Sequence, residues 1–289
     1  METKHILWAV LVAAIWGVNF VVIRIGLDDF PPILLNALRF AATGVLFAWF
    51  IPRPNIPFAY VVGVGLVLGV AKFSLLFIGM DLGMPAGLAS LVLQAQAFFT
   101  VIFAAIFLQE RPKLEQYLGI PIALAGLLLI ALDLGQGGVV SAFMMVIAAA
   151  ACWGVANIII KKSHADSMLG LFVWASLVAA VPLFALSWMF EDTDKIVYAL
   201  THINLKGVAT IGYLVVASTL IGFGLWGKLL KLYPASMVAP FSLLVPAFGL
   251  TSAAIVLGES LSLTKATGSV LIIVGLVVNV GLWKRFRRN

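Results

Sequence analysis

The feature that most constrains this chain is a series of apolar stretches, each about twenty residues long and separated by short polar breaks. A helix of about 20 apolar residues crosses the hydrocarbon core of a membrane. Ten such helices are expected, at residues 6–26, 32–51, 57–80, 85–108, 114–132, 139–160, 168–190, 207–230, 235–257 and 264–283. The sequence therefore predicts an all-α integral membrane protein with ten transmembrane helices.

The composition excludes a soluble globular domain. Charged residues make up 10% and hydrophobic residues 63% of the 289 residues, whereas about 25% charge is usual in soluble domains. Ten spans leave loops too short for a cofactor-binding, zinc-binding or nucleic-acid-binding domain. We therefore expect the lipid bilayer and a small-molecule substrate as partners, no nucleic acid, no cofactor or metal, and a functional monomer.

The basic residues predict the orientation of the chain. Counted over alternate loops, twelve Lys and Arg residues fall on the side of both termini and four on the other side, which also holds eight of the twelve acidic residues. Loops rich in Lys and Arg stay in the cytoplasm. Both termini are therefore expected to be cytoplasmic.

The two halves of the chain resemble each other. Residues 16–24 are similar to residues 153–161, and seven positions from Pro85 to Gly126 recur from Pro234 to Gly275 at an offset of 149. We expect one five-helix repeat at residues 1–135 and a second at residues 136–289. Five is an odd number, so the second repeat is inverted in the membrane. Inverted repeats allow a carrier to open alternately to either side of a central site.

Four segments carry a resemblance to a known family. They are WGVNFVVIR at 16–24, LRF at 38–40, GMPAGLASLVLQAQAFFT at 83–100 and LLVPAFGL at 243–250. They resemble the EamA family of the drug/metabolite transporter superfamily, most closely its bacterial exporters of amino acids and their metabolites. The resemblance implies a multi-pass exporter in the bacterial inner (cytoplasmic) membrane. It also implies a cavity lined by the first, third, fourth, sixth, eighth and ninth helices, with the fifth and tenth at the periphery.

Polar residues in the first and sixth helices are the first candidates for a binding site. Trp16 with Asn19, and Trp153 with Asn157, share a helix face in the two related halves. Lipid cannot satisfy polar groups, so these side chains are expected to face the bundle interior. An asparagine donates and accepts hydrogen bonds, which suits a zwitterionic ligand. The alternative is that the asparagines bond between helices and the tryptophans fill packing space.

The fourth and ninth helices supply further candidates. Gln94 and Gln96 lie about 200° apart on an ideal helix, so we expect only one of them to face the cavity. Gln94, which shares a face with Phe98, is preferred. Two prolines in the ninth helix free backbone carbonyls, and Ser242 adds a hydroxyl there. The alternative is a kink that serves packing alone.

Arg39 and Lys72 are the two cations expected inside the membrane. A charge there costs about 2.5–3.5 kcal/mol on insertion scales, so each should face water or a partner. Arg39 is expected to clamp backbone carbonyls or helix C-termini. Lys72 is expected to attract a substrate carboxylate, or alternatively to extend its amine to the membrane surface.

These observations favour a secondary transporter that exports amino acids and related small metabolites from the cytoplasm by alternating access. The alternatives are a drug or sugar-phosphate carrier of the same superfamily, or a passive channel. An enzyme is not expected, because the spans hold no carboxylate pair and no histidine beside a serine. The expected substrate-binding residues are Trp16, Asn19, Lys72, Gln94, Phe98, Trp153, Asn157 and Ser242.

Overall fold

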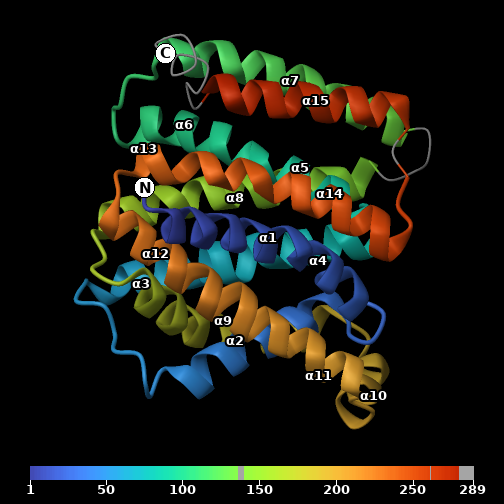
Figure 1. Cartoon of the computed structure of the whole chain (residues 1–289). Helices are drawn as coiled ribbons and strands as arrows, with labels where there is room; N and C mark the ends of the chain where they lie inside the picture. Colours follow the sequence, from blue (N-terminus) through green and yellow to red (C-terminus); the bar gives the residue numbers. More distant parts are fainter. Residues whose placement is uncertain (136–139, 261, 280–289) are drawn as a thin grey trace.

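The computed structural model describes residues 1–135, 140–260 and 262–279, and every regular element in them is helical (Figure 1). The first part of the chain forms α1 (Thr3–Gly26), α2 (Pro32–Phe47), α3 (Phe58–Val64), η1 (Gly65–Lys72), α4 (Phe73–Asp81), α5 (Ala86–Val92), η2 (Leu93–Ala95), α6 (Gln96–Phe107) and α7 (Leu114–Gly135). The remaining elements are α8 (Val140–Ser163), α9 (Met168–Phe190), α10 (Thr193–Thr201), α11 (Leu205–Gly212), η3 (Tyr213–Ile221), α12 (Gly222–Leu232), α13 (Ala235–Val238), η4 (Ala239–Leu243), α14 (Leu244–Leu257) and α15 (Leu263–Asn279).

Within the described residues, eight helices or continuous helical groups are long and apolar enough to cross a membrane. Two further expected spans, α2 and α15, are apolar but have 16 and 17 residues. At 1.5 Å per residue each is about 25 Å long, slightly less than a hydrocarbon core of about 30 Å. The helix α2 ends at Phe47 rather than at residue 51, and Pro52 disfavours helical backbone at residue 51 itself. The expected end of the last helix, residues 280–283, lies outside the described residues.

The elements α3, η1 and α4 form one continuous span, and α11, η3 and α12 form another. The middle of each, η1 and η3, is a π-helix. In a π-helix the hydrogen-bond pattern changes, and such segments are frequent at functional sites. A short 3₁₀ segment, η2, likewise interrupts the span of α5 and α6. The sequence pattern predicts regular α-helix throughout these three spans, and the structure differs from that prediction at η1, η2 and η3.

The polar stretch 191–206, predicted from the sequence as a loop, contains a short helix. This helix, α10, begins after Asp192, whose side chain accepts a hydrogen bond of 2.9 Å from the N–H of Asp194. Asp192 is thus an N-cap, which stabilises a helix start. The helix lies at the end of the bundle away from Thr3 (Figure 1).

The bundle has two ends, which we name by their loops. The N-terminal face holds Thr3 and the loops 48–57, 108–113, 164–167 and 233–234 (Figure 1). The opposite face holds the loops 27–31, 82–85, 191–192 and 258–260. Each transmembrane helix therefore runs from one face to the other.

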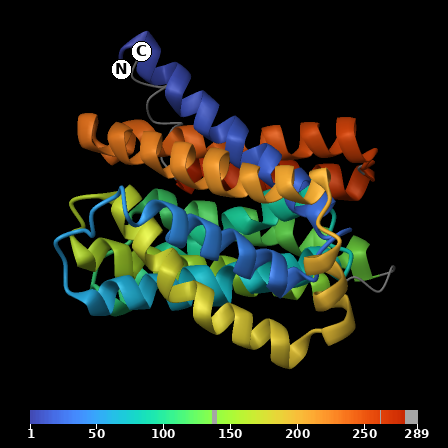
Figure 2. The same cartoon turned by 90° about the horizontal axis from the view of Figure 1, so that it is seen from below.

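The helices pack in two layers. One layer has α1 against α12 and α14, and the other has α8 against α4 and α6, as Figure 2 shows from below. At one edge α7 packs along α15, and toward the other edge α2 packs along α9 (Figure 1). The α7–α15 pair is close because a Cβ added to Gly126 would lie 2.5 Å from the carbonyl oxygen of Gly268. Only glycine permits that approach.

The outer surface of the bundle is apolar. Leu128, Val181 and Ile255 are 60%, 75% and 77% exposed. Contiguous exposed apolar surface of this kind is unusual on a soluble monomer and suits contact with lipid. Several polar side chains of the spans, among them Asn19, Arg39 and Lys72, are buried inside the bundle.

Candidate functional site

A cavity of about 420 Å³ lies inside the bundle, between the two layers. This volume is within the range of small-molecule sites. Seven of the eight expected substrate-binding residues line it: Trp16, Asn19, Lys72, Gln94, Trp153, Asn157 and Ser242. The peripheral pair α7 and α15 contributes no described residue to the lining.

The cavity extends from the middle of the bundle toward the N-terminal face. Met168 at the start of α9 and Leu230 near the end of α12 line it, and both lie close to that face. Toward the opposite face the lining reaches only Leu76 of α4 among the described residues of that span. The cavity is therefore closed toward the opposite face.

One wall of the cavity is aromatic. Trp16 lies with its ring centroid 5.2 Å from that of Phe223 and 5.3 Å from that of Trp226. Its Nε1 donates a hydrogen bond of 3.1 Å to the carbonyl oxygen of Ser218, within the π-helix η3. Phe172 of α9 stacks on Phe223 at 3.7 Å. The wall is thus a fixed apolar surface that suits a hydrocarbon or aromatic group.

The two asparagines have different environments. Asn157 donates through Nδ2 to Gln96 Oε1 at 2.8 Å and to Thr100 Oγ1 at 3.0 Å, which ties α8 to α6. Asn157 therefore bonds between helices, which is the alternative to substrate binding given in the sequence analysis. The Oδ1 atom of Asn19 is buried and has no hydrogen-bond partner in the described structure. Asn19 therefore keeps an acceptor available inside the cavity.

The expectation that only one of Gln94 and Gln96 faces the cavity is wrong, because both line it. The 3₁₀ segment η2 includes Gln94 and ends just before Gln96. A 3₁₀-helix has 3.0 residues per turn, so two successive residues rotate about 120° each rather than 100°. The added rotation moves the two amides toward a common side.

The structure places Phe98 elsewhere. It is buried and lines a separate apolar hollow of about 290 Å³, together with residues of α7 and α8 such as Leu127 and Phe143. Gln94 and Phe98 would share a face on a regular α-helix. The 3₁₀ segment η2, which includes Gln94, changes the angle between the two side chains around the helix axis. Phe98 is therefore removed from the candidate set for the central cavity.

Arg39 and Lys72 both line the cavity, and each is only 2% exposed. Lys72 does not reach the membrane surface: its Nζ lies 3.3 Å from the ring centroid of Phe73 and 4.4 Å from that of Trp153. Arg39 donates from Nη2 to Thr219 Oγ1 at 3.3 Å, and not to a backbone carbonyl as expected. Thr219 in turn donates to the carbonyl oxygen of Leu214 in η3. Arg39 lies on the second span, and the seventh span, α9, contributes Met168 and Phe172 to the lining. Both spans are therefore part of the site, in addition to the helices that the resemblance implied.

Carboxylates close the opposite face. Glu259 accepts hydrogen bonds of 2.7 and 2.9 Å from the N–H groups of Ala86 and Gly87, at the start of α5. Glu191 accepts bonds of 2.6 and 3.0 Å from Ile33 and Leu34 N–H, at the start of α2. A carboxylate at a helix N-terminus satisfies free donors and complements the helix dipole. Both caps come from the second half of the chain and act on helices of the first.

Glu191 also accepts a hydrogen bond of 2.7 Å from Ser187 Oγ. Burial raises the pKa of the Glu191 carboxyl above its ordinary value, and the bonds from Ser187 and the two backbone N–H groups offset part of that shift. The carboxyl lies beyond the end of α9, outside the spans.

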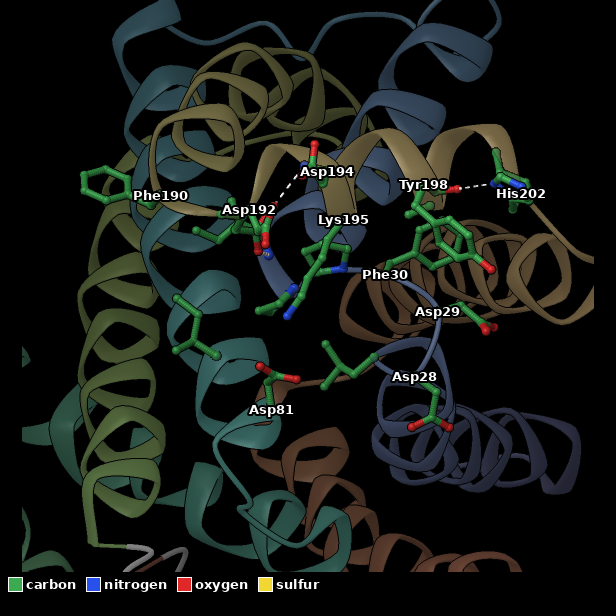
Figure 3. A pocket seen from close by; sticks show the side chains of 18 of the residues that line it. Asp28, Asp29, Phe30, Asp81, Phe190, Asp192, Asp194, Lys195, Tyr198 and His202 are labelled. Atoms are coloured by element: carbon green, nitrogen blue, oxygen red, sulfur yellow. Dashed lines mark hydrogen bonds between the residues drawn. The ribbon is translucent and has the colours of Figure 1, made fainter.

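A second hollow, of about 1040 Å³, lies at the opposite face and is lined by several acidic residues (Figure 3). Two of its carboxylates, Asp28 and Asp29, pair with cations. Asp28 pairs with Arg24 at 3.1 Å, and Asp29 pairs with Lys206 at 3.2 Å. We therefore place the candidate site in the central cavity rather than in this outer hollow. In the described part of the chain no three His, Cys, Asp or Glu side chains are grouped so that they could hold a metal ion.

The EamA-like transporter family matches residues 3–132 and again residues 140–281. The chain belongs to the EamA-like transporter family. Together with its apolar helices, this membership makes it a multi-pass membrane protein of a transporter family.

Among curated relatives of this EamA-like transporter, one from Salmonella typhimurium is 42% identical over 97% of this chain and 96% of the relative. One from Escherichia coli (strain K12) is 40% identical over 99% and 98%. Both are named probable amino-acid metabolite efflux pump. A third, from Streptantibioticus cattleyicolor, is 28% identical over 96% and 94% and is named probable terminal-alkyne amino-acid exporter.

A solved crystal structure has the same fold as this EamA-like transporter. The TM-score is 0.56 at 19% sequence identity, and the match covers 98% of this chain and 100% of the other. The similarity supports the helical arrangement and carries no information about substrate.

Proposed function

We propose that this EamA-like transporter exports amino acids and related small metabolites from the cytoplasm as a secondary carrier with alternating access. The observation that carries the proposal is the central cavity, whose lining extends toward the N-terminal face and ends at Leu76 before the opposite face. The names of the relatives at 40% and 42% identity supply the substrate class. A cavity closed at one end favours a carrier over a passive channel. We propose no catalytic step.

In this proposal the chain contains ten spans, arranged as two inverted five-helix repeats at residues 1–135 and 136–289. Contacts at equivalent positions support it. A Cβ on Gly17 would lie 2.5 Å from Phe248 Cβ, and one on Gly154 would lie 2.8 Å from Phe99 Cβ. Gly154 is the repeat partner of Gly17, and Phe248 that of Phe99, so the same contact occurs twice. The boundary itself, at 135/136, adjoins residues 136–139, which lie outside the described structure.

The glycines of α7 and α15 support the inverted arrangement further. Gly126 meets Gly268 and Gly119 meets Gly275, each with a Cβ-to-carbonyl approach of 2.5 Å. Gly268 is the repeat partner of Gly119, and Gly275 that of Gly126. The repeat therefore converts the contact of Gly126 with Gly268 into the contact of Gly275 with Gly119, as a two-fold axis requires. An axis of this kind in the membrane plane relates inverted repeats.

In the proposed mechanism the two layers rock about the cavity. The present state is open to the cytoplasm if both termini are cytoplasmic, as the excess of basic residues indicates. Glu259 and Glu191 hold the periplasmic side closed by capping α5 and α2. Substrate entry would be followed by release of the Glu259 cap and opening of the opposite face. The protein acts as a monomer in the bacterial inner membrane in this proposal.

The proposed substrate-binding residues have distinct tasks. Lys72 attracts a carboxylate, while Asn19 accepts a hydrogen bond from a substrate N–H. Trp16 and Trp153 supply apolar walls, and Ser242 contributes a hydroxyl that also donates to Ala239 O at 2.7 Å. The remaining proposed contacts are the amides Gln94 and Asn157.

Transport by the purified full chain in proteoliposomes tests the proposal. A panel of labelled amino acids and related metabolites is offered, and saturable transport of at least one of them is expected. Trp16→Ala, which opens the aromatic wall, is expected to raise the KM on the order of tenfold, since such a wall is worth about 1–3 kcal/mol to an apolar group. Leu128→Ala, on the outer surface, is the matched control and is expected to transport normally. Absence of saturable transport for the whole panel would overturn the proposal.

The orientation is tested separately. Reporter fusions after Asn289 and within α10 at Asp194 are expected to give opposite signals, cytoplasmic for Asn289 and periplasmic for Asp194. The same signal from both fusions would contradict the inverted repeat.

A further inference from the structure

Two cations share the wall of the central cavity without a counter-charge. Arg39 and Lys72 lie over the same ring, that of Phe73, with Arg39 Cζ at 4.2 Å and Lys72 Nζ at 3.3 Å from its centroid. Because one ring touches both groups, the two cationic groups are close neighbours. Among the described residues that line the cavity, none is Asp or Glu.

The donors of both side chains are largely unused. The Nε and Nη1 atoms of Arg39 are buried and have no hydrogen-bond partner in the described structure. Lys72 has no hydrogen bond or ion pair among the described residues, and its Nζ lies over the aromatic faces of Phe73 and Trp153. A buried guanidinium with free N–H groups is an unfavourable arrangement unless an anion compensates it. A carboxylate matches the planar donor pair of arginine.

Among its described residues the cavity offers no carboxylate to a substrate ammonium group. Its free acceptors are neutral: Asn19 Oδ1 is buried without a partner, and the amide of Gln94 lines the cavity without a hydrogen bond in the described structure. The amides Gln96 and Asn157 are bonded to each other. A neutral acceptor suits an amide N–H or a hydroxyl, whereas a zwitterion would bring a second buried positive charge beside two existing ones.

We propose that this site selects carboxylate metabolites of net negative charge over zwitterionic amino acids. The class comprises amino-acid derivatives whose amine is blocked or absent, and derivatives with a second carboxylate. The carboxylate binds Arg39 and Lys72, an amide N–H or hydroxyl binds Asn19, and the side chain lies against Trp16. This inference rests on the proposed export function and specifies its substrate.

A matched series of one side chain tests the charge preference. The full chain in proteoliposomes is offered N-acetyl-leucine, leucine and leucinamide, which carry charges of about −1, 0 and +1 at neutral pH. The transport efficiency kcat/KM is expected to fall in that order, with about a tenfold advantage of N-acetyl-leucine over leucine. Equal efficiencies, or leucine ahead of N-acetyl-leucine, would overturn the charge preference and leave the export function standing. If none of the three moves and the wider panel also fails, the export function itself is wrong.

Variants assign the preference to the two cations. Lys72→Gln breaks no hydrogen bond of the described structure and is expected to remove most of the advantage of N-acetyl-leucine over leucine, while Lys72→Arg restores it. Arg39→Gln is expected to have the same effect, but it also removes the bond to Thr219. The amount of monodisperse protein on size exclusion is therefore measured for each variant, and Lys72→Gln carries the test if Arg39→Gln does not fold. An unchanged N-acetyl-leucine to leucine ratio in folded Lys72→Gln would contradict the assignment.

Discussion

Glu259 at the opposite face and Glu110 at the N-terminal face occupy equivalent positions of the two repeats but have different partners. The backbone before both is the same: Gln109 has φ 56° and Gly258 has φ 67°. Each glutamate N–H donates at 3.3 Å to a carbonyl six residues earlier, Ala104 or Ala253. The two faces therefore share one backbone motif.

The side chains differ. Glu259 caps the start of α5 with both oxygens, whereas Glu110 pairs at 2.6 Å with Lys161. The Glu110–Lys161 side chains are 47% and 58% exposed, and such surface pairs contribute about 0–1 kcal/mol. A helix cap contributes about 0.5–2 kcal/mol. Glu259 therefore holds the start of α5 at the opposite face. In the described structure the equivalent Glu110 caps no helix at the N-terminal face.

We propose that the two glutamates exchange roles during transport. Pro234 and Ala235 are the repeat partners of Pro85 and Ala86, so the helix start at Ala235 is the one that Glu110 would cap in the state open to the periplasm. Glu259 would then be released. The following predictions test this comparison.

The largest effect is expected from Glu259→Ala. Loss of the cap should favour opening of the opposite face on the order of tenfold, as expected for about 1.4 kcal/mol. Spin labels at the exposed positions Leu82, after α4, and Leu263, at the start of α15, report the change, since their distance should lengthen in a larger fraction of molecules. A distance distribution identical to that of the unsubstituted Glu259 protein would show that this cap does not hold the face closed.

A smaller and opposite effect is expected from Glu110→Ala. The present state should be almost unchanged, because only an exposed ion pair is lost. The transport rate should nevertheless fall several-fold, because the state open to the periplasm loses its cap. Lys161→Ala is the control: it removes the same ion pair but keeps the carboxylate, so its rate should be preserved. Equal losses of rate in both variants would instead assign the effect to the ion pair.

The smallest effect concerns Glu191, the other cap of the closed face. Its folded-state pKa is raised by burial, so the folded chain binds a proton more readily than the unfolded chain does. The stability of the protein with Glu191, relative to Glu191→Gln, should therefore decrease as the pH rises from about 4.5 through the raised pKa, and then level off. Melting temperatures in detergent across that range measure it. A difference that grows with rising pH would contradict the sign.

Much of this arrangement was predictable from residue patterns. Apolar length indicated the spans, and the repeated Trp16 and Trp153 were expected to face the bundle interior, where both line the cavity. The family resemblance placed the fifth and tenth helices at the periphery, where α7 and α15 lie (Figure 1). The spans and the repeat follow from composition and local spacing, which a sequence displays directly, whereas the peripheral place of the fifth and tenth helices was implied by the resemblance alone.

The errors arose where the backbone departs from a regular α-helix. The 3₁₀ segment η2 brought Gln94 and Gln96 to one cavity and turned Phe98 away from it. The π-helix η3 holds the Ser218 carbonyl that Trp16 binds and the Thr219 hydroxyl that Arg39 binds. Such departures depend on packing between helices and have no simple periodic signature. The repeat of Glu110 and Glu259 was visible, but the capping role required the fold.

Side-specific labelling of one cysteine inside the cavity tests the central claim of alternating access most directly. Gln94→Cys is placed in a Cys152→Ser background, and the rates of reaction with a membrane-impermeant thiol reagent are measured from each side of the membrane. With Glu259 intact, reaction from the cytoplasmic side should predominate. With Glu259→Ala, the periplasmic rate should rise while the cytoplasmic rate falls. A rise of both rates together would indicate an open pore, and rates that do not respond to Glu259→Ala would contradict the proposed exchange of caps.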